Sequence, residues 1–516
     1  MMSEEKGICY LVGAGPGDPG LMTLRGKECI ERADVIVYDY LSNDEFLRWA
    51  KPDAEMIYAG KKAKNHAIPQ GGINELLVEK TREGKIVTRL KGGDPLVFGR
   101  GGEEAEELRD AGVRFEIVPG ISSSIAGPAY AGIPVTHRDH CSQLTIFTGH
   151  EKPEKDESSI DYEQIANAPG TKVMLMGVER LPIITGAIEK AGGDPEMPVA
   201  LVRWATTGQH RTIIGTLATI AEIAEREEFK APAVAVFGTV VNCREKLNWF
   251  EERPLYGKKV VVTRTQKQAS RMSRELRELG ADVFEMPTIR IRPSEGEEKR
   301  EFFECVKDAH TYDWLIFTSP NAVTYFFDAF YQLHDDARAI GGVRIAVVGP
   351  GTAERLKDFH MATDLMPDKH VADEIPAAFQ EKVGSIENLT MLWVRAKGAR
   401  EVLSRELNAA GVILDEAIAY VTEPETDDPT GAVQRFREEG ADIITFTSAS
   451  TVEGFLDLGL GIPDETAIAS IGPITSQALA ENNYEPDLEA ASSDIPGLIE
   501  AVIELASESF EGDFVG

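Results

Sequence analysis

The chain has 516 residues, of which 42% are apolar and 7% aromatic, a composition typical of two to four globular domains without a bias toward disorder. Its formal net charge of −32 disfavours nucleic acid and anionic membranes as partners. Five scattered cysteines with no CxxC pair argue against a disulfide framework and against a cysteine-rich metal site. No apolar run approaches the roughly 20 residues that span a bilayer, so we expect a cytoplasmic protein.

Residues 7–248 are expected to be α/β, because apolar strand-like runs alternate with helix-like segments. The strand-like runs are ICYLV, DVIVYD, KIVTRL, RFEIVP, QLTIFTG, TKVMLMG, PVALVRW and AVAVFG. Helix-like segments include INELLVEKTREG and GGEEAEELRDAG. A polar stretch near residue 151, HEKPEKDESSIDYEQIANAPG, divides this region and predicts a module of two lobes.

The segment 249–256 has the charged residues and the proline of a connector, and a new strand-like run, VVVTR, follows it. From residue 257 onward the chain carries an internal duplication. A strand ending in arginine, an FTS motif and a GP motif recur in one order, as VVVTR, LIFTSPNAV and VVGPGTA and again as MLWVRA, ITFTSASTV and SIGPITS. Two similar α/β lobes around a ligand cleft are therefore predicted. We place lobe one at about 257–290 and 422–516, and lobe two at about 291–421.

The stretch YLVGAGPGDPG, which starts at Tyr10, places three glycines between a strand-like run and a helix, as nucleotide-binding loops do. A dinucleotide loop needs its third glycine at position 18, where Asp18 would repel a pyrophosphate, and Pro16 lacks an N–H. No GK[ST] follows, which argues against a triphosphate loop. Asp39, where a ribose-binding acid would lie, keeps the dinucleotide alternative open, and a tight turn without a ligand is another alternative.

Two further glycine-rich loops follow strand-like runs, TRLKGGDPLVFGRGGEE and VPGISSSIAGPAYAGIPVTHRD, and no oxidoreductase requires the first of them. VMLMGVE and PVALVRWATTGQHRTIIGTL complete the set. Loops of glycine, serine and methionine can hold an adenosine through backbone groups and apolar contact, without a phosphate site. A sulfonium cofactor suits that chemistry.

On these motifs, residues 7–248 resemble the uroporphyrinogen-III C-methyltransferases of the tetrapyrrole methylase family, which use S-adenosyl-L-methionine. The motifs GAGPGDPGLMTLRGK, YAGKKA, RLKGGDPLVFGRGGEE, VPGISS and GIPVTHRD stand in the family's order. IPQGGIN replaces the more usual acidic QEEIN, and alanine replaces a frequent glycine at one cofactor position. The cofactor contacts implied by the resemblance fall on Pro16, Gly92, Gly93, Asp94, Val97, Ser122, Ser123, Met176 and Ala205.

The resemblance also implies Asp39 as the proton acceptor and Lys61 as the proton donor while an electron-rich pyrrole carbon attacks the methyl group on sulfur. From the residues alone, two alternatives stay open: Asp39 is a carboxylate that caps a turn, and Lys61 is a solvated lysine. The substrate carries eight carboxylates, so we expect cations within these motifs to face it, or else to balance nearby acids. They are Arg25, Lys61, Lys62, Lys64, His66, Arg89, Lys91, Arg100 and Arg138. HRDH, residues 137–140, is a weak metal-site alternative, and no metal is expected.

Residues 257–516 resemble uroporphyrinogen-III synthases, through VVTR, FTSPNAV, VVGPGTA, Tyr420, FTSAS and IGPITS. The resemblance implies no cofactor for this half, and closure of linear hydroxymethylbilane into a ring with inversion of the last pyrrole. Tyr420 is the candidate that assists departure of the hydroxyl group, or else an aromatic packed between lobes. The candidate substrate-binding residues are Arg264, Ser319, Arg395, Ser448 and Thr475.

The sequence therefore predicts a bifunctional enzyme with a methyltransferase at 1–248, a linker at 249–256 and a synthase at 257–516. The methyltransferase would methylate the synthase's product twice and stop at precorrin-2, as a homodimer through the methyltransferase half. Three alternatives remain: another tetrapyrrole methylase, a non-catalytic tetrapyrrole-binding protein, and a nicotinamide oxidoreductase.

Overall fold

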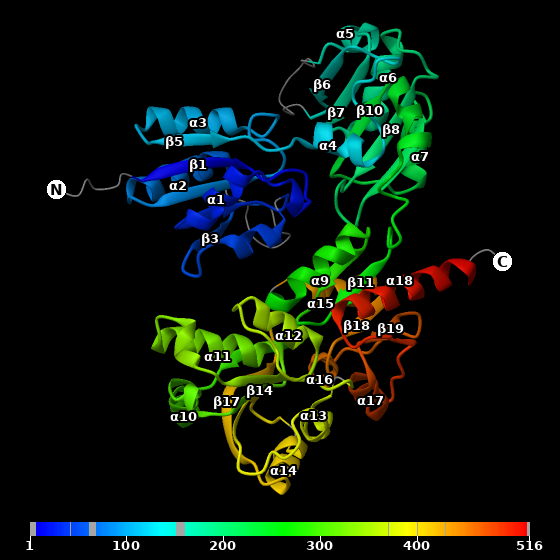
Figure 1. Ribbon diagram of the computed structural model, residues 1–516. Coiled ribbons are helices and arrows are strands. Elements are labelled where there is room, and N and C mark those ends of the chain that lie inside the picture. The colour runs from blue at the N-terminus through cyan, green and yellow to red at the C-terminus, as the bar shows by residue number, and fades with distance from the viewer. Residues whose placement is uncertain are drawn as a thin grey trace. The chain divides into compact units, whose positions relative to one another are not determined.

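The computed structural model describes residues 7–41, 43–60, 69–150, 160–369, 371–399, 401–428 and 430–512, apart from the side chains of 44, 266–270 and 508–512. The chain divides into two compact units, the first comprising Met1–Lys258 and Arg277–Asp282, the second Lys259–Leu276 and Val283–Gly516. Within these residues the chain forms four five-stranded sheets, accompanied by helices, so the expected α/β class is confirmed (Figure 1). Across the described ranges, no helix is both long and apolar enough to cross a membrane.

The first sheet of the first unit is entirely parallel, with strand order β3-β2-β4-β1-β5. Its strands are β1 (Ile8–Gly13), β2 (Val35–Tyr38), β3 (Glu55–Tyr58), β4 (Ile86–Lys91) and β5 (Phe115–Val118). The connecting helices are α1 (Leu24–Arg32), α2 (Gln70–Arg82) and α3 (Gly101–Asp110). β1, β2 and β4 are continuously buried, as strands covered on both faces are. Because all five strands are parallel, the loops that leave their carboxyl ends gather at one edge of the sheet.

The second sheet of this unit is mixed, with order β6-β7-β10-β8-β9, and only β6 and β7 are parallel. Its strands are β6 (Leu144–Thr148), β7 (Thr171–Leu175), β8 (Pro198–Arg203), β9 (Arg211–Thr216) and β10 (Ala233–Phe237). The helices of this part are α4 (Ser123–Tyr130), α5 (Tyr162–Asn167), α6 (Leu181–Lys190), α7 (Ile220–Arg226) and α8 (Arg244–Leu247). Residues 249–256, expected to be a connector, pack into the first unit, where Phe250 is 2% and Leu255 0% exposed.

The second unit contains one sheet of order β12-β11-β18-β19-β20 and one of order β13-β17-β16-β14-β15. The former is built from β11 (Lys259–Val262), β12 (Asp282–Glu285), β18 (Ile443–Phe446), β19 (Ala467–Ser470) and β20 (Leu488–Glu489). The latter is built from β13 (Ile289–Pro293), β14 (Trp314–Phe317), β15 (Arg344–Val347), β16 (Thr390–Ala396) and β17 (Ile413–Pro424). β13 and β17 are antiparallel and both lie in the second of these sheets, so this sheet begins and ends two or three residues beyond the expected 291–421.

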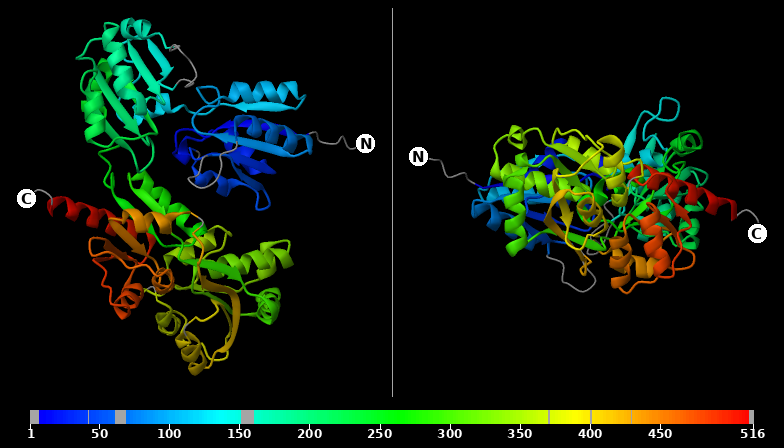
Figure 2. Two further views of the ribbon diagram at one scale, coloured as in Figure 1. Left: turned by 180° about the vertical axis from the view of Figure 1, so that it is seen from behind. Right: turned by 60° about the horizontal axis from the view of Figure 1, so that its bottom comes forward.

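Helices connect the strands of both sheets. They are α9 (Gln266–Glu278), α10 (Gly296–Lys307), α11 (Pro320–Leu333), α12 (Pro350–Lys357), α13 (Ile375–Lys382), α14 (Val402–Ala409), α15 (Ala432–Glu439), α16 (Ala449–Asp457), α17 (Pro473–Glu481) and α18 (Ile495–Gly512). The carboxyl-terminal helix α18, red in Figure 2, packs against β18, β19 and β20.

The two sheets of the second unit repeat one arrangement, in which β11, β18 and β19 correspond to β16, β14 and β15. Each FTS motif is the turn from a strand into a helix, β14 into α11 and β18 into α16. Each GP motif is likewise a turn, β15 into α12 and β19 into α17. The repeated motifs therefore lie at the carboxyl ends of parallel strands, where such folds place ligand-binding groups.

Matching aspartates hold the strand starts in both sheets. The Oδ2 atoms of Asp442 and Asp313 each accept a hydrogen bond from the first residue of the neighbouring strand, at 2.6 Å from Lys259 N and 2.8 Å from Thr390 N. A second pair, Asp364 and Asp487, accepts at 2.8 and 2.7 Å from backbone N–H groups of β15 and β19. The duplication thus extends to side-chain contacts that fix strand register.

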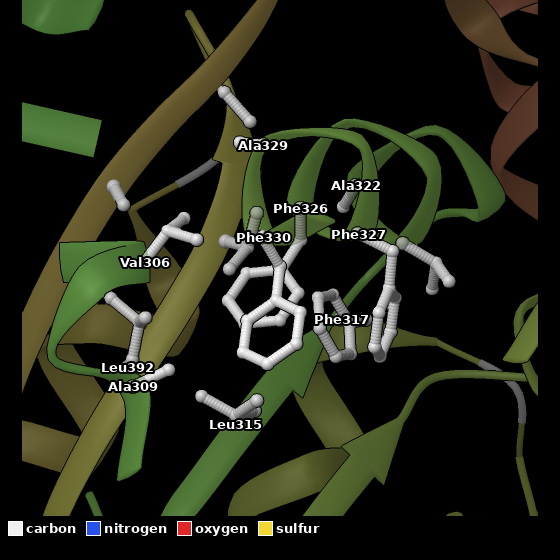
Figure 3. Packing of buried hydrophobic residues seen from close by; sticks show 14 of the residues in the cluster. Val306, Ala309, Leu315, Phe317, Ala322, Phe326, Phe327, Ala329, Phe330 and Leu392 are labelled. Atoms are coloured by element: carbon white, nitrogen blue, oxygen red, sulfur yellow. The ribbon is translucent and has the colours of Figure 1, made fainter. Parts of the chain in front are cut away.

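The largest core cluster of the second unit centres on α11 (Figure 3). Its sequence PNAVTYFFDAFYQL buries positions three and four residues apart, which places one apolar face on the sheet. Phe326 is fully buried, with its ring centroid 5.3 Å from that of Phe317 and 5.2 Å from that of Phe327.

We expect Phe326→Ala to lower the opening free energy of the second unit by about 3–5 kcal/mol, because a close-packed core collapses little around the cavity. Hydrogen–deuterium exchange of the β14 amides measures it. Leu333→Ala, which removes an exposed side chain from the same helix, is the control and should cost less than about 1 kcal/mol. Equal losses in the two variants would contradict this account of the core.

Candidate active sites

Three backbone turns approach one another closely at the carboxyl ends of β1, β4 and β5. A Cβ added at Gly13 would lie 2.5 Å from Gly120 N, and one added at Gly120 would lie 2.3 Å from Gly93 O. Real Cβ atoms do not come that close to backbone atoms, so these positions require glycine. The glycines of the three motifs therefore let the loops pass one another.

Three N–H groups of these loops already have backbone acceptors. Ala14 N donates to Lys91 O at 2.7 Å and Gly15 N to Gly93 O at 3.1 Å, while Gly93 N donates back to Gly15 O at 2.7 Å. A phosphate-binding loop directs such N–H groups at its ligand. This hydrogen bonding disfavours the dinucleotide alternative.

Asp18 organises the first loop. Its Oδ1 accepts from Gly20 N at 2.7 Å and caps a short helical turn, and its Oδ2 accepts from the Tyr130 hydroxyl at 2.9 Å. Its own N–H donates to Thr206 Oγ1 at 3.1 Å. Asp18 thus joins the Pro16 loop to α4 and to the loop that carries Ala205.

The predicted cofactor residues Asp94 and Ser122 also use their side chains locally. Asp94 Oδ2 accepts from Gly120 N at 3.0 Å and its Oδ1 from Leu96 N at 2.8 Å. Ser122 caps α4 and its Oγ lies 2.9 Å from Ser124 Oγ. Contacts from this region to a ligand would therefore come largely from the backbone around Gly92, Gly93 and Ser123, as expected of the family.

Val97, Met176 and Ala205 belong to three different loops that meet at one apolar cluster. Val97 packs against the cluster that contains Ala205 and Leu175, the residue before Met176. The backbone here is strained, since Met176 has φ +56° and is 53% exposed. Four other non-glycine residues near Val97 and Ala205 also have positive φ, namely Phe98, Arg100, Trp204 and Thr206. Such strain concentrates at functional sites.

Asp39 follows β2 at the same edge of the sheet. Its Oδ2 lies 3.1 Å from Arg89 Nη2, and its Oδ1 accepts from Leu41 N at 3.1 Å. The carboxylate therefore caps a turn, as the alternative reading of the sequence expected, and also pairs with a buried guanidinium. Lys61 lies outside the described residues, as do Lys62, Lys64 and His66.

Several cations expected to face the anionic substrate are paired with acids instead. Arg89 and Lys91 are 4% exposed, and both approach the buried Glu104, at 3.5 Å from Arg89 Nε and 2.7 Å from Lys91 Nζ. Burial, followed by the charge of Arg89, lowers the pKa of Lys91, and Glu104 opposes this shift. The expectation that these two cations face substrate is therefore wrong, because they point into the sheet's covered face.

The other described cations, Arg25, Arg100 and Arg138, are half-buried or exposed. Arg25 pairs with Glu116 at 3.0 Å, and Arg100 pairs with Glu103 at 2.6 Å. Arg138 is exposed. In the HRDH segment, the rings of residues 137 and 140 lie 5.0 Å apart. Over the described ranges, no cluster of His, Cys, Asp and Glu is arranged to hold a metal ion.

In the second unit, Tyr420 and Ser319 come together. The Tyr420 hydroxyl lies 2.7 Å from Ser319 Oγ, and the Tyr325 ring stacks on that of Tyr420 at 5.5 Å. A register shift between Arg395 and Ala396 places a bulge beside Tyr420. Burial raises the pKa of Tyr420, against a smaller opposite effect of the bond with Ser319, so the phenol stays protonated.

The other predicted synthase residues divide between the two sheets. Arg264, Ser448 and Thr475 follow β11, β18 and β19, three neighbouring parallel strands, and so share one edge. Burial lowers the pKa of Arg264 to about 10. Arg395, the last residue but one of β16, pairs with Glu416 at 2.8 Å.

Ser448 and Thr475 lie at the starts of α16 and α17, the helices that follow β18 and β19. Ser448 forms a reciprocal capping box with Thr451 at the start of α16. Thr475 is 3% exposed in the first turn of α17.

Each of the two units matches a known protein family. Residues 9–221 match the family of tetrapyrrole (corrin/porphyrin) methylases, and residues 270–500 match uroporphyrinogen-III synthase HemD. A protein of Ruminiclostridium josui named porphyrin biosynthesis protein HemD is 37% identical over 502 residues, 97% of this chain and 98% of its own. The chain belongs to both families, fused in this order.

Other relatives match the methylase unit alone. The S-adenosyl-L-methionine-dependent uroporphyrinogen III methyltransferase of Methanosarcina barkeri is 51% identical over 48% of this chain and 96% of its own. The crystal structure of uroporphyrin-III C-methyl transferase from Thermus thermophilus with S-adenosyl homocysteine is 38% identical, covers 46% of this chain and 99% of its own, and has a TM-score of 0.40.

Two charged networks of the methylase unit were not anticipated from its sequence. In the first, the carboxylate of Glu104 in α3 pairs with the cations of Arg89 and Lys91. The other joins Glu251 to His210 and Arg244 across 41 and 7 residues of sequence. The acidic residues at the start of GGEEAEELRDAG are visible in the sequence. There they indicate only the start of a helix, not the network of Glu104.

Gly120→Ala tests the close approach of the loops in the methylase unit. The added methyl group meets backbone that has no room to move, so we expect a loss of about 2–3 kcal/mol in stability. Pulse proteolysis in urea measures it. Gly102→Ala is the control, since its Cβ would meet nothing within 4 Å. Equal resistance of the two variants would contradict the close approach.

Proposed function

We propose that the chain is a bifunctional tetrapyrrole enzyme, with synthase and methyltransferase activities on separate units. The synthase cyclises hydroxymethylbilane to uroporphyrinogen III with inversion of the last ring. The methyltransferase then transfers two methyl groups, to C2 and C7, and gives precorrin-2. One observation carries the proposal: a relative aligned over 97% of the chain spans both family matches in the same order. We assign the methyltransferase to 1–248, a connector that packs on the methyltransferase unit to 249–256, and the synthase to 257–516.

The loops of the first unit fit S-adenosyl-L-methionine better than a nucleotide with a pyrophosphate. They offer glycines at close approach, a capping serine, an apolar cluster and a strained methionine, and several of their N–H groups already have acceptors. When bound, this cofactor would supply a methyl group on a positively charged sulfur. The residues proposed to hold it are Pro16, Gly92, Gly93, Asp94, Val97, Ser122, Ser123, Met176 and Ala205.

Asp39 is the proposed proton acceptor of the methyltransferase and Lys61 the proposed donor. Arg89 fixes the orientation of the Asp39 carboxylate through the 3.1 Å contact. A carboxylate at this edge takes up or relays the proton that the substrate releases as the new C–C bond forms.

Tyr420 is the proposed hydrogen-bond donor of the synthase. Ser319 Oγ accepts from Ala322 N at 3.1 Å, so its own hydrogen is free to be donated to the Tyr420 oxygen at 2.7 Å. The phenol hydrogen is then available for the departing hydroxyl of the substrate. The proposed substrate-binding residues are Arg264, Ser319, Arg395, Ser448 and Thr475, and no cofactor is required.

We also propose a homodimer formed through the methyltransferase unit, and a cytoplasmic location. The family resemblance supports the former, and five free cysteines support the latter. Light scattering after size exclusion measures the assembly.

Pure protein given hydroxymethylbilane should yield uroporphyrinogen III without S-adenosyl-L-methionine, and a dimethylated product with it. Isomer-resolved chromatography with mass spectrometry distinguishes these products. Recovery of only the type-I isomer would refute the synthase, and absence of methylation on supplied uroporphyrinogen III would refute the methyltransferase.

Single substitutions should separate the two activities. Asp39→Asn removes the proton acceptor, so methylation should fall about 100-fold or more while the synthase rate is retained. Tyr420→Phe should slow the synthase about tenfold and leave methylation intact. Asp53→Asn and Tyr331→Phe, at exposed positions, are the respective controls. Loss of both activities in either variant would argue against separate sites.

A further inference from the structure

The segment 244–256 is built into the methylase unit. Phe250 is 2% exposed, and its ring centroid lies 5.1 Å from the rings of both Tyr130 and His210. Gly132 packs so closely on this segment that an added Cβ would lie 2.5 Å from Leu247 O. A flexible linker has no need of such contacts.

This segment holds the end of α4. Arg244 Nη1 donates to Ala131 O at 2.6 Å, and Trp249 Nε1 donates to Ala129 O at 3.1 Å. The opposite end of the same helix carries Ser122 and Ser123. Because α4 is a single short helix, fixing its end constrains the two serines as well.

The segment also holds the loop after β8, which carries Ala205. Glu251 Oε1 lies 3.2 Å from Nε2 of His210, whose side chain is completely buried. The Tyr256 hydroxyl donates to His210 O at 2.9 Å. In the same loop, Thr206 accepts from Asp18 N, which extends the connection to the loop of Pro16.

Glu251 is the charged centre of these contacts. It pairs with Arg244 through its second oxygen, and its side chain is only 15% exposed. Burial alone would raise the pKa of Glu251, but the bond from His210 and the charge of Arg244 lower it to about 2. The carboxylate is therefore ionised at neutral pH, and removing it would leave the buried Arg244 guanidinium unpaired.

We propose that Glu251 is a positioning residue of the methyltransferase, which acts through Arg244 and His210 to hold α4 and the Ala205 loop in the arrangement that binds the cofactor. The proposal rests on the proposed function, since it requires that these loops bind S-adenosyl-L-methionine. Glu251 itself lies behind the loops and carries no part of the methyl or proton transfer.

The test is Glu251→Gln in the full chain, with Glu252→Gln as a matched control that removes the same charge at a neighbouring exposed position. Calorimetry with S-adenosylhomocysteine should give a Kd about tenfold higher for Glu251→Gln. The KM for S-adenosyl-L-methionine should rise in parallel while kcat stays within about twofold, since the reacting groups are untouched. Glu252→Gln should match the wild type.

A Kd unchanged by Glu251→Gln, or a fall in kcat at constant Kd, would overturn the proposal. If the wild type itself binds no S-adenosylhomocysteine, the proposed methyltransferase function fails instead. If Glu251→Gln does not fold, the Kd of the variant Tyr130→Phe for S-adenosylhomocysteine tests the proposal instead. This variant removes only the bond from Tyr130 to Asp18, and should raise Kd at least about threefold. An unchanged Kd there would count against the proposal.

Discussion

The methylase unit depends on three backbone turns that pass one another closely, at Gly13, Gly93 and Gly120. There is no room for a methyl group at Gly13 or Gly120, and Gly93 has a positive φ of +69°. This close approach follows from the parallel sheet, which brings the turns after β1, β4 and β5 to one edge. It uses several loop N–H groups of the kind that a phosphate would need, and apolar side chains of the neighbouring loops pack together beside it. This arrangement suits a cationic cofactor without a phosphate group better than a nucleotide with a pyrophosphate.

In the synthase unit, each of the two sheets likewise brings the turns after its parallel strands to one edge. The FTS and GP motifs are turns at the carboxyl ends of parallel strands, and aspartates at equivalent positions fix the neighbouring strand starts. Polar groups from turns far apart in sequence therefore share an edge in each sheet. Tyr420 enters this arrangement from β17, beside a bulge that interrupts the regular register.

The sequence predicts the α/β class and the motif positions well, because both depend on local periodicity and on turn residues. It does not predict the partners of Arg89 and Lys91, since nothing local states that α3 brings Glu104 beneath them. For the same reason, the sequence does not predict that the connector 249–256 packs into the first unit. The proline and charges of this segment are typical of a linker, yet Glu251 pairs with His210, 41 residues earlier in the chain. Partners of buried charges are set by tertiary packing, and composition carries little information about them.

The pairing of β11 with β18 has a consequence for the order in which a ribosome delivers the chain. Residues Val260–Val262 hydrogen-bond with Ile443–Thr445, so the first synthase sheet lacks its central partner until more than four-fifths of the chain has been synthesised. Both sheets of the methylase unit are complete by residue 237. During translation, domains fold as units from the amino terminus. A nascent chain can therefore carry a finished methyl-transfer unit well before any synthase exists to supply it, and premature termination would remove the earlier reaction of the pair while sparing the later one.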